Sequence, residues 1–354
     1  MNVRLQDLRV IYEQEIKKRV KNKRKIFMFE RNKFEYLCEM KRELDNGTYQ
    51  GGKYNVFVVF RPKLRVVMSQ GIYDKTINHY VTRFILMPKF EKYLSPYNCA
   101  TRKDMGTSFA IKLLKRLIEK YKKTNREIYY AKLDISKYFY TIDHHKVLSL
   151  IRNELSEEEY ELVKTILETT NREYVNKYIN YFSRKYKMEL PLYYIDKGLP
   201  IGNMTSQFLA VFYLSKVHHY ITHNLHLDFV NYMDDYIFLS NDKAYLESCL
   251  KEIANIIEKE YLLRINSKKT YIANIKNGLP FLGHVFYVKN GKTIVRLTES
   301  TKRGIKRGIK RSKYYFESGL IDFNQLFCSI ETYKYSYAFI KDKTVENIIN
   351  RYWY

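Results

Sequence analysis

The spacing of apolar residues predicts a chain in which helices alternate with short strands. Apolar side chains recur every three or four positions through residues 1–48, 74–90 and 244–260, which indicates amphipathic helices. Residues 54–60 and 64–68 instead form two short apolar segments around a basic turn, the pattern of a β-hairpin. This mixture predicts an α+β fold.

A second pair of apolar segments encloses two adjacent carboxylates. Residues 227–230 and 236–239 are rich in aromatic and β-branched residues and predict two strands joined by a tight turn. Asp234 and Asp235 at this turn bring like charges together, which is costly unless a cation lies there. A solvated Asp-Asp turn is the alternative, and the apolar strands around it make that alternative less favourable.

Another carboxylate ends a predicted strand at residues 128–135. Tyr129, Ala131 and Leu133 alternate onto one apolar face, so Asp134 points the other way. A carboxylate near the end of such a strand is a ready metal ligand. Asp143 opens the next predicted helix, where a capping role is expected.

The charge of the chain favours a polyanionic partner. Lys and Arg number 63 against 38 Asp and Glu, a formal net charge of +25. Such a field suits nucleic acid or an anionic membrane surface. No segment of about eighteen apolar residues predicts a membrane span, and residues 1–8 lack the apolar region of a signal peptide. The four cysteines are widely scattered, which fits reduced thiols in a cytoplasm rather than a disulfide framework.

Two loops and one helix carry further candidate contacts. Arg102 and Lys103 precede a predicted helix, whose N-terminus would suit a phosphate, although surface charges have the same pattern. Residues 198–207 contain two glycines and a proline, so their backbone can approach a ligand closely. In residues 302–311, cations recur every four positions along one helical stripe, and a phosphate backbone is the natural counterion.

These motifs together resemble those of reverse transcriptases. Tyr232–Asp235 between two strands is similar to the catalytic hairpin of that family, and residues 97–107 resemble a segment of its members related to group II introns. Most members carry Gln-Gly and Ser-Pro where this chain has Ile201-Gly202 and Ser206-Gln207. The pattern in this chain resembles the enzymes of diversity-generating retroelements, in which it accompanies poor fidelity opposite template adenine. The resemblance covers roughly residues 50–340.

The resemblance implies a right-hand polymerase fold with fingers, palm and thumb. The palm would be an antiparallel sheet with packed helices, and the thumb would be short and helical. The expected boundaries are a basic helical N-terminal extension at 1–50, fingers at 51–125, palm at 126–290, and thumb with C-terminal helices at 291–354.

The resemblance also assigns roles to residues. Asp134 and Asp234 would hold two Mg²⁺ ions, for which Mn²⁺ can substitute, roughly 3.5–4 Å apart, with Asp235 and the Ile135 carbonyl assisting. Lys269 would act on the leaving pyrophosphate. The expected nucleotide-binding residues are Lys63, Arg65, Phe139, Ile201, Gly202 and Gln207. The expected nucleic-acid contacts are Arg102, Lys103, Gly283, Lys302, Arg303, Lys306, Arg307 and Lys310.

The function implied is RNA-directed DNA polymerase activity, copying a template RNA into cDNA from dNTPs. The expected partners are the template RNA, the RNA/DNA duplex and a small helical accessory protein or a second copy of the chain, without a membrane. The expected location is the bacterial cytoplasm. Two alternatives stay open: an antiphage defence enzyme that uses an associated non-coding RNA, and an RNA-binding scaffold without catalysis.

Overall fold

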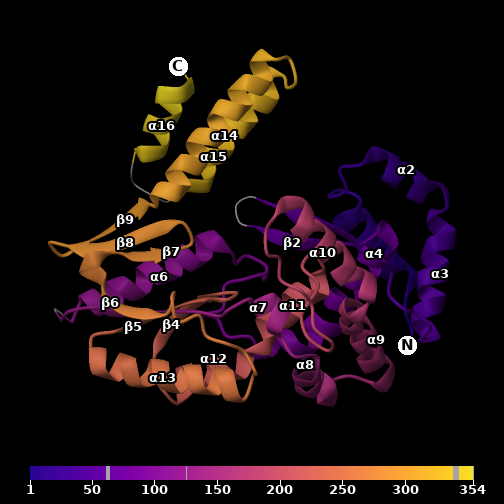
Figure 1. Cartoon of the computed structure of the whole chain (residues 1–354), viewed down its shortest axis with the longest axis horizontal. Helices are drawn as coiled ribbons and strands as arrows, with labels where there is room; N and C mark the ends of the chain where they lie inside the picture. Colours follow the sequence, from indigo (N-terminus) through magenta and orange to yellow (C-terminus); the bar gives the residue numbers. More distant parts are fainter. Residues whose placement is uncertain (61–63, 125, 338–342, 354) are drawn as a thin grey trace.

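The computed structural model describes residues 1–60, 64–124, 126–337 and 343–353. Its elements form an N-terminal helical region with a β-hairpin, a central sheet between helices, and a C-terminal group of strands and helices (Figure 1). This α+β composition with antiparallel sheets confirms the fold class predicted from the apolar pattern.

The N-terminal helices pack on the helices that follow the hairpin. Glu15 of the first π-helix bonds to His79 Nδ1 at 2.8 Å and to Arg83 Nε at 2.6 Å. This partly buried cluster fixes the N-terminal extension to the rest of the molecule. The elements concerned are α1 (Leu5–Ile11), η1 (Tyr12–Ile16), α2 (Lys23–Arg31), α3 (Lys33–Asp45), α4 (Ile72–Tyr80), η2 (Val81–Leu86), α5 (Met87–Phe90) and η3 (Glu91–Tyr93).

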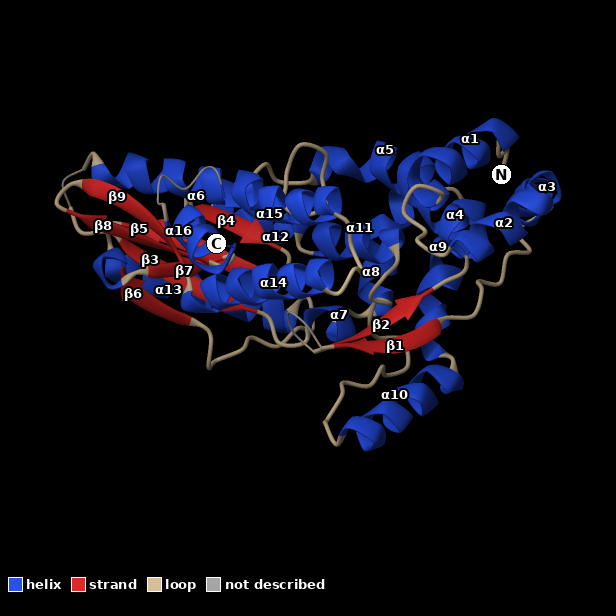
Figure 2. Ribbon diagram, turned by 90° about the horizontal axis from the view of Figure 1, so that it is seen from above, coloured by secondary structure: helices blue, strands red, loops and turns tan. Residues whose placement is uncertain are grey.

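The predicted β-hairpin is present as β1 (Asn55–Val59) and β2 (Arg65–Ser69), which pair antiparallel. Its turn, including the candidate Lys63, lies outside the described residues. Helix α10 (Glu173–Tyr186) packs on the outside of this hairpin (Figure 2). Further helical segments connect the hairpin region to the central sheet: α7 (Tyr138–Thr141), α8 (His144–Ile151), η4 (Arg152–Glu154), α9 (Glu157–Glu168) and η5 (Thr169–Asn171).

The central sheet has four antiparallel strands in the order β4-β5-β3-β6. Apolar side chains of these strands are buried on both faces, because helices cover one side and a helix with a second sheet covers the other. The strands are β3 (Tyr129–Asp134), β4 (Asp228–Tyr232), β5 (Asp235–Ser240) and β6 (Tyr271–Asn274). The covering helices are α11 (Met204–Tyr213), α12 (Ser215–His223) and α13 (Lys243–Lys259) on one face and α6 (Thr107–Lys122) on the other.

A three-stranded antiparallel sheet leads into the C-terminal helices, which have a small apolar core of their own. The last described elements are η6 (Ile275–Asn277), β7 (Leu279–Phe281), β8 (His284–Lys289), β9 (Lys292–Leu297), α14 (Glu299–Glu317), α15 (Phe323–Tyr337) and α16 (Thr344–Trp353). None of the helices in the described ranges is long and apolar enough to span a membrane.

Candidate catalytic site

The Asp-Asp hairpin is a tight two-residue turn at the end of the central sheet. Tyr232 pairs with Asp235 across β4 and β5, which leaves Met233 and Asp234 as the turn. Met233 has a φ of +58°, and its carbonyl accepts a hydrogen bond from Asn231 Nδ2 at 2.8 Å. The short turn therefore fixes Asp234 at the tip of the hairpin.

The strand register brings the third carboxylate to this hairpin. Asp134, the last residue of β3, pairs with Asp235 of β5, so the two side chains leave the same face of the sheet. The Ile135 amide donates to the Asp234 carbonyl at 3.4 Å. Sequence reasoning assigned the Ile135 carbonyl to a metal, and this role stays a prediction.

Asp235 is paired with a lysine on the neighbouring strand. Lys132 Nζ lies 3.0 Å from Asp235 Oδ1 and 3.2 Å from Oδ2, and both side chains are mostly buried. Burial raises the pKa of Asp235, the Lys132 ammonium lowers it, and the nearby charges of Asp234 and Asp134 raise it again. The net shift is upward. The sequence pattern did not predict this ion pair.

Asp134 is paired with a different lysine. Lys269 Nζ lies 3.2 Å from Asp134 Oδ2, and Asn266 Nδ2 donates to the same oxygen at 2.9 Å. The Asn266 amide also donates to the Asp134 carbonyl at 2.8 Å. The structure therefore places Lys269, predicted to act on the leaving pyrophosphate, directly beside the candidate metal ligand Asp134.

The donor set fits a hard divalent cation, the group that the resemblance implies. Asp134, Asp234 and Asp235 supply carboxylate oxygens at neighbouring positions, the ligand type that Mg²⁺ prefers. Within the described ranges, no group of three or more His, Cys, Asp or Glu side chains is already arranged to hold a metal ion. Lysine ammonium groups instead lie beside two of these carboxylates, those of Asp235 and Asp134.

Four of the predicted nucleotide-binding residues lie in or beside the loop before α11: Phe139, Ile201, Gly202 and Gln207. Leu199 N donates to the Phe139 carbonyl at 2.6 Å, which ties this loop to the segment that follows Asp134. Met68 N of β2 donates to the Ile201 carbonyl at 2.8 Å. Gly202 has a φ of +129°, and a Cβ there would come within 2.6 Å of the Met68 oxygen. Glycine is therefore required where the loop meets the hairpin.

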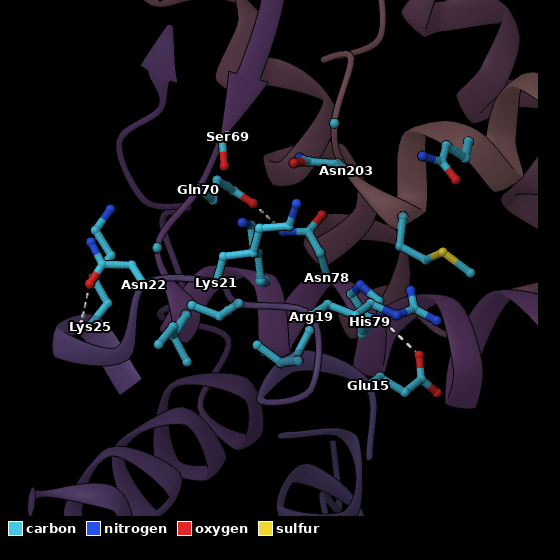
Figure 3. A pocket seen from close by; sticks show the side chains of 18 residues that line it. Glu15, Arg19, Lys21, Asn22, Lys25, Ser69, Gln70, Asn78, His79 and Asn203 are labelled. Atoms are coloured by element: carbon cyan, nitrogen blue, oxygen red, sulfur yellow. Dashed lines mark hydrogen bonds and ion pairs between the residues drawn. The ribbon is translucent and has the colours of Figure 1, made fainter. Parts of the chain in front are cut away.

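A basic pocket of about 400 Å³ adjoins this loop (Figure 3). Gly202 and Gln207 line it together with cations of the N-terminal region and α4. Burial, followed by the nearby charge of Lys25, lowers the pKa of Lys75, one of the lining residues. Sequence reasoning missed Lys75, because an isolated lysine on an amphipathic helix gives no signal. Arg65 is exposed on β2, next to the undescribed turn.

The predicted nucleic-acid residues before α6 and after β7 have different surroundings. Arg102 is turned inward, where Nη1 donates to the Ser95 carbonyl at 2.9 Å, whereas Lys103 is exposed. The Gly283 carbonyl accepts from the Thr298 amide at 2.9 Å and from Thr301 Oγ1 at 3.0 Å. Gly283 thus joins the second sheet to the start of α14.

The predicted cationic stripe on α14 is partly covered by the last helix. Lys302 pairs with Glu299 at 2.8 Å. The Nζ atoms of Lys306 and Lys310 lie 4.4 and 5.1 Å from the ring centre of Tyr352 on α16. The role of residues 302, 306 and 310 in contacting a phosphate backbone stays a prediction, and the structure adds that the Tyr352 ring lies beside two of these lysines. The adjacent Arg303 and Arg307 are exposed.

Residues 62–286 match the family described as reverse transcriptase (RNA-dependent DNA polymerase). Among curated protein sequences, none matches the chain.

Solved structures similar to the chain include telomerases. Apo telomerase from Candida tropicalis has a TM-score of 0.50 at 13% identity, covering 79% of this chain and 51% of that one. The same enzyme truncated from its C-terminal domain gives 0.49 at 14% identity, covering 71% and 55%. Telomerase from Candida albicans, in complex with a fragment of telomeric RNA, gives 0.49 at 11%, covering 86% and 58%.

The chain spans little more than half the length of these telomerases. At 13% identity the likeness to apo telomerase from Candida tropicalis concerns the fold alone, and it fits a polymerase fold. The family match covers more than half of the chain and contains Asp134, Asp234 and Asp235. The chain therefore belongs to the reverse transcriptase (RNA-dependent DNA polymerase) family.

Proposed function

We propose that this protein copies a template RNA into cDNA by adding deoxynucleotides to the 3′ end of a primer. The observation that carries the proposal is the register of the central sheet. This register sets Asp134, the last residue of β3, opposite Asp235, the first residue of β5, and beside the Asp234 turn. Oxygen ligands at these positions suit phosphoryl transfer, in which positioning and charge stabilisation dominate.

Each candidate residue of the site has a proposed role in the reaction. Asp134 and Asp234 would hold the metal ions, which, when bound, activate the primer hydroxyl and stabilise the leaving oxygen. Lys132 holds the third carboxylate, that of Asp235, in place through its ion pair. Lys269, whose Nζ lies 3.2 Å from Asp134, would neutralise or protonate the leaving pyrophosphate.

Selection of the incoming nucleotide is proposed for Phe139 and the loop that contacts it. Phe139 is half-buried on α7, five residues beyond Asp134, and its carbonyl accepts a hydrogen bond from Leu199. In this position its ring would lie under the sugar and exclude a 2′-hydroxyl group. Arg65 and Lys63 would then bind the triphosphate, and Gln207 would support the template base.

The biological role that we favour is that of a diversity-generating retroelement. The proposal is supported by Ile201-Gly202 and Ser206-Gln207, which stand where most reverse transcriptases carry other residues. A template RNA, dNTPs and a small helical accessory protein or second copy of the chain are the partners it requires. We place the enzyme in the bacterial cytoplasm, where its four free cysteines would stay reduced.

One observation favours antiphage defence as a second candidate. The segment from Arg172 to Tyr194 departs from the retroelement pattern, and it forms a separate helix, α10, against the β-hairpin. In that role the enzyme would make DNA from an associated non-coding RNA. A scaffold without catalysis is disfavoured, because all three carboxylates lie at neighbouring positions.

The polymerase proposal is tested by a conservative substitution at the turn. Asp234→Asn keeps the size of the side chain and removes its charge, so primer extension on an RNA template with Mg²⁺ should fall below detection while nucleic-acid binding persists. Asp228→Asn, at the other end of the same hairpin, is the matched control and should retain activity. Extension by the Asp234 variant at the wild-type rate would show that the metal assignment is wrong.

The biological role is tested by sequencing the RNA and DNA that purify with the protein from its host. A defined structured RNA, with cDNA substitutions concentrated opposite adenine, would support the retroelement. Faithful or repetitive cDNA from a non-coding RNA during phage infection would support defence. Bound RNA without any cDNA would support the scaffold.

A further inference from the structure

An exposed surface of aromatic and basic side chains lies on α10, far along the chain from the catalytic residues. We name it the α10 platform and define it by Phe60, Tyr178, Tyr181, Lys185 and Tyr186. Tyr178 and Tyr181 are 51% and 55% exposed. Large aromatic side chains exposed together usually mark an interaction site.

The platform rests on a helix that is firmly attached. Val175 and Ile179 on the inner side of α10 are fully buried in a cluster with residues of β1 and β2. Arg172, just before the helix, donates to the backbone carbonyls of Gln50 and Gly52 at 2.5 and 2.9 Å. The helix therefore presents its outer side chains from a fixed position, which lowers the entropic cost of binding.

The rings form a continuous path from α10 to the end of β1. Tyr181 contacts Phe182 with ring centres 5.3 Å apart, and Phe182 lies nearly parallel to Tyr186 at 6.0 Å. Tyr186 then contacts Phe60 at 4.8 Å. Figure 2 shows α10 alongside the outer face of the hairpin. The path therefore ends beside the hairpin that is expected to bind the nucleotide.

Positive charge accompanies the rings. Lys185 Nζ lies 5.7 Å from the centre of the Tyr181 ring and 5.8 Å from that of Tyr186. Arg184 and Lys187 are exposed in the same turn. Among the ion pairs of the described residues, none involves Arg184, Lys185 or Lys187. The acidic Glu173 of α10 is already paired with Lys177 at 2.8 Å. The exposed Glu189 is the next acidic residue after the helix, so the three cations still give this surface a net positive charge.

We propose that the α10 platform binds single-stranded RNA outside the catalytic site. Exposed rings offer stacking faces for unpaired bases, and neighbouring cations attract the phosphates between them. A duplex would hide its base faces from these rings. An apolar protein partner would bury three cations without compensation, which is unfavourable. The proposal rests on the proposed function in one respect, because the RNA bound here would be the single-stranded part of the template.

The test separates stacking from general surface effects. The double variant Tyr178→Ala/Tyr181→Ala should bind a labelled oligouridylate of about 15 nucleotides at least about tenfold more weakly than wild type. Tyr178→Phe/Tyr181→Phe should bind normally, because phenylalanine keeps the stacking face. Lys185→Ala should reduce the slope of log affinity against log salt concentration by about 0.7. Tyr245→Ala, an exposed tyrosine on α13, is the control and should change nothing.

The outcomes are distinguishable from a failure of the proposed function. Primer extension on a template without a long 5′ overhang should be equal for wild type and the double alanine variant, since the platform is outside the catalytic site. Absence of extension by wild type would refute the polymerase proposal alone. Unchanged oligouridylate affinity of a folded alanine variant would refute the platform. Loss of a bound protein partner with RNA affinity intact would assign the surface to that partner instead and refute our proposal.

Discussion

Replacement of Lys132 by methionine tests how the catalytic carboxylates are held. The Lys132–Asp235 pair has N–O distances of 3.0 and 3.2 Å, and the two side chains are 15% and 23% exposed. Removing one partner of a fully buried ion pair costs about 3–5 kcal/mol, because the remaining charge is left without compensation. Since both groups retain some contact with solvent, we expect a loss of about 2–3 kcal/mol in the free energy of unfolding.

Chemical denaturation of both Lys132→Met and Lys120→Met measures this loss against a matched control. Lys120 pairs with Asp228 at a shorter distance, 2.6 Å, but is 65% exposed. Its replacement should therefore cost less than about 1 kcal/mol. Combining Lys132→Met with Asp235→Asn should restore most of the stability, because the uncompensated charge is removed. The reasoning is refuted if Lys132→Met is no more destabilising than Lys120→Met.

Three further predictions concern other regions. Gly202→Ala should lower the free energy of unfolding by about 1–3 kcal/mol through backbone strain and raise the KM for dNTP; unchanged values in denaturation and kinetics would contradict this. Burial lowers the pKa of His218 to about 3. The stability that comes from burying neutral His218 should therefore be fully present above the unfolded pKa near 6.5, and the free energy of unfolding should fall by up to about 2 kcal/mol by pH 5. His218→Gln should reduce this loss in denaturation curves; equal losses in the variant and wild type would contradict the prediction. Tyr352→Leu should free Lys306 and Lys310 for phosphate contacts. The slope of log affinity for a template–primer duplex against log salt concentration should then steepen by about one to two; an unchanged slope would contradict this.

Local sequence patterns were sufficient to predict the central elements of the site. Asp134 ends an alternating strand, and the Asp234-Asp235 turn is enclosed by apolar segments, so both the strands and their exposed ends follow from the residues around them. The structure adds the register that sets Asp134 opposite Asp235. The helices of the N-terminal region and the hairpin at 54–68 were predicted for the same local reason.

The interactions that the sequence did not predict join distant residues. Lys132 and Asp235 are 103 positions apart, and no periodicity links a lysine on one strand to the carboxylate it will meet. The same is true of Tyr352 on α16, whose ring lies beside two lysines of α14 that were expected to bind a duplex. Similarly, the aromatic spacing in α10 does not reveal that Phe60 will extend its row of rings. Tertiary packing decides such pairs, and a single sequence records no trace of them.

The junction between the glycine loop and the hairpin has a mechanical consequence. Met68 donates its amide to Ile201 and lies against Gly202, while Leu199 donates to Phe139. One short loop is thereby fastened to β2, which is expected to approach the triphosphate, and to the backbone of Phe139, whose ring is proposed to contact the sugar. A displacement of the loop, of β2 or of Phe139 should therefore shift the other two. If the protein copies RNA as proposed, errors in base choice and in sugar choice should rise and fall together.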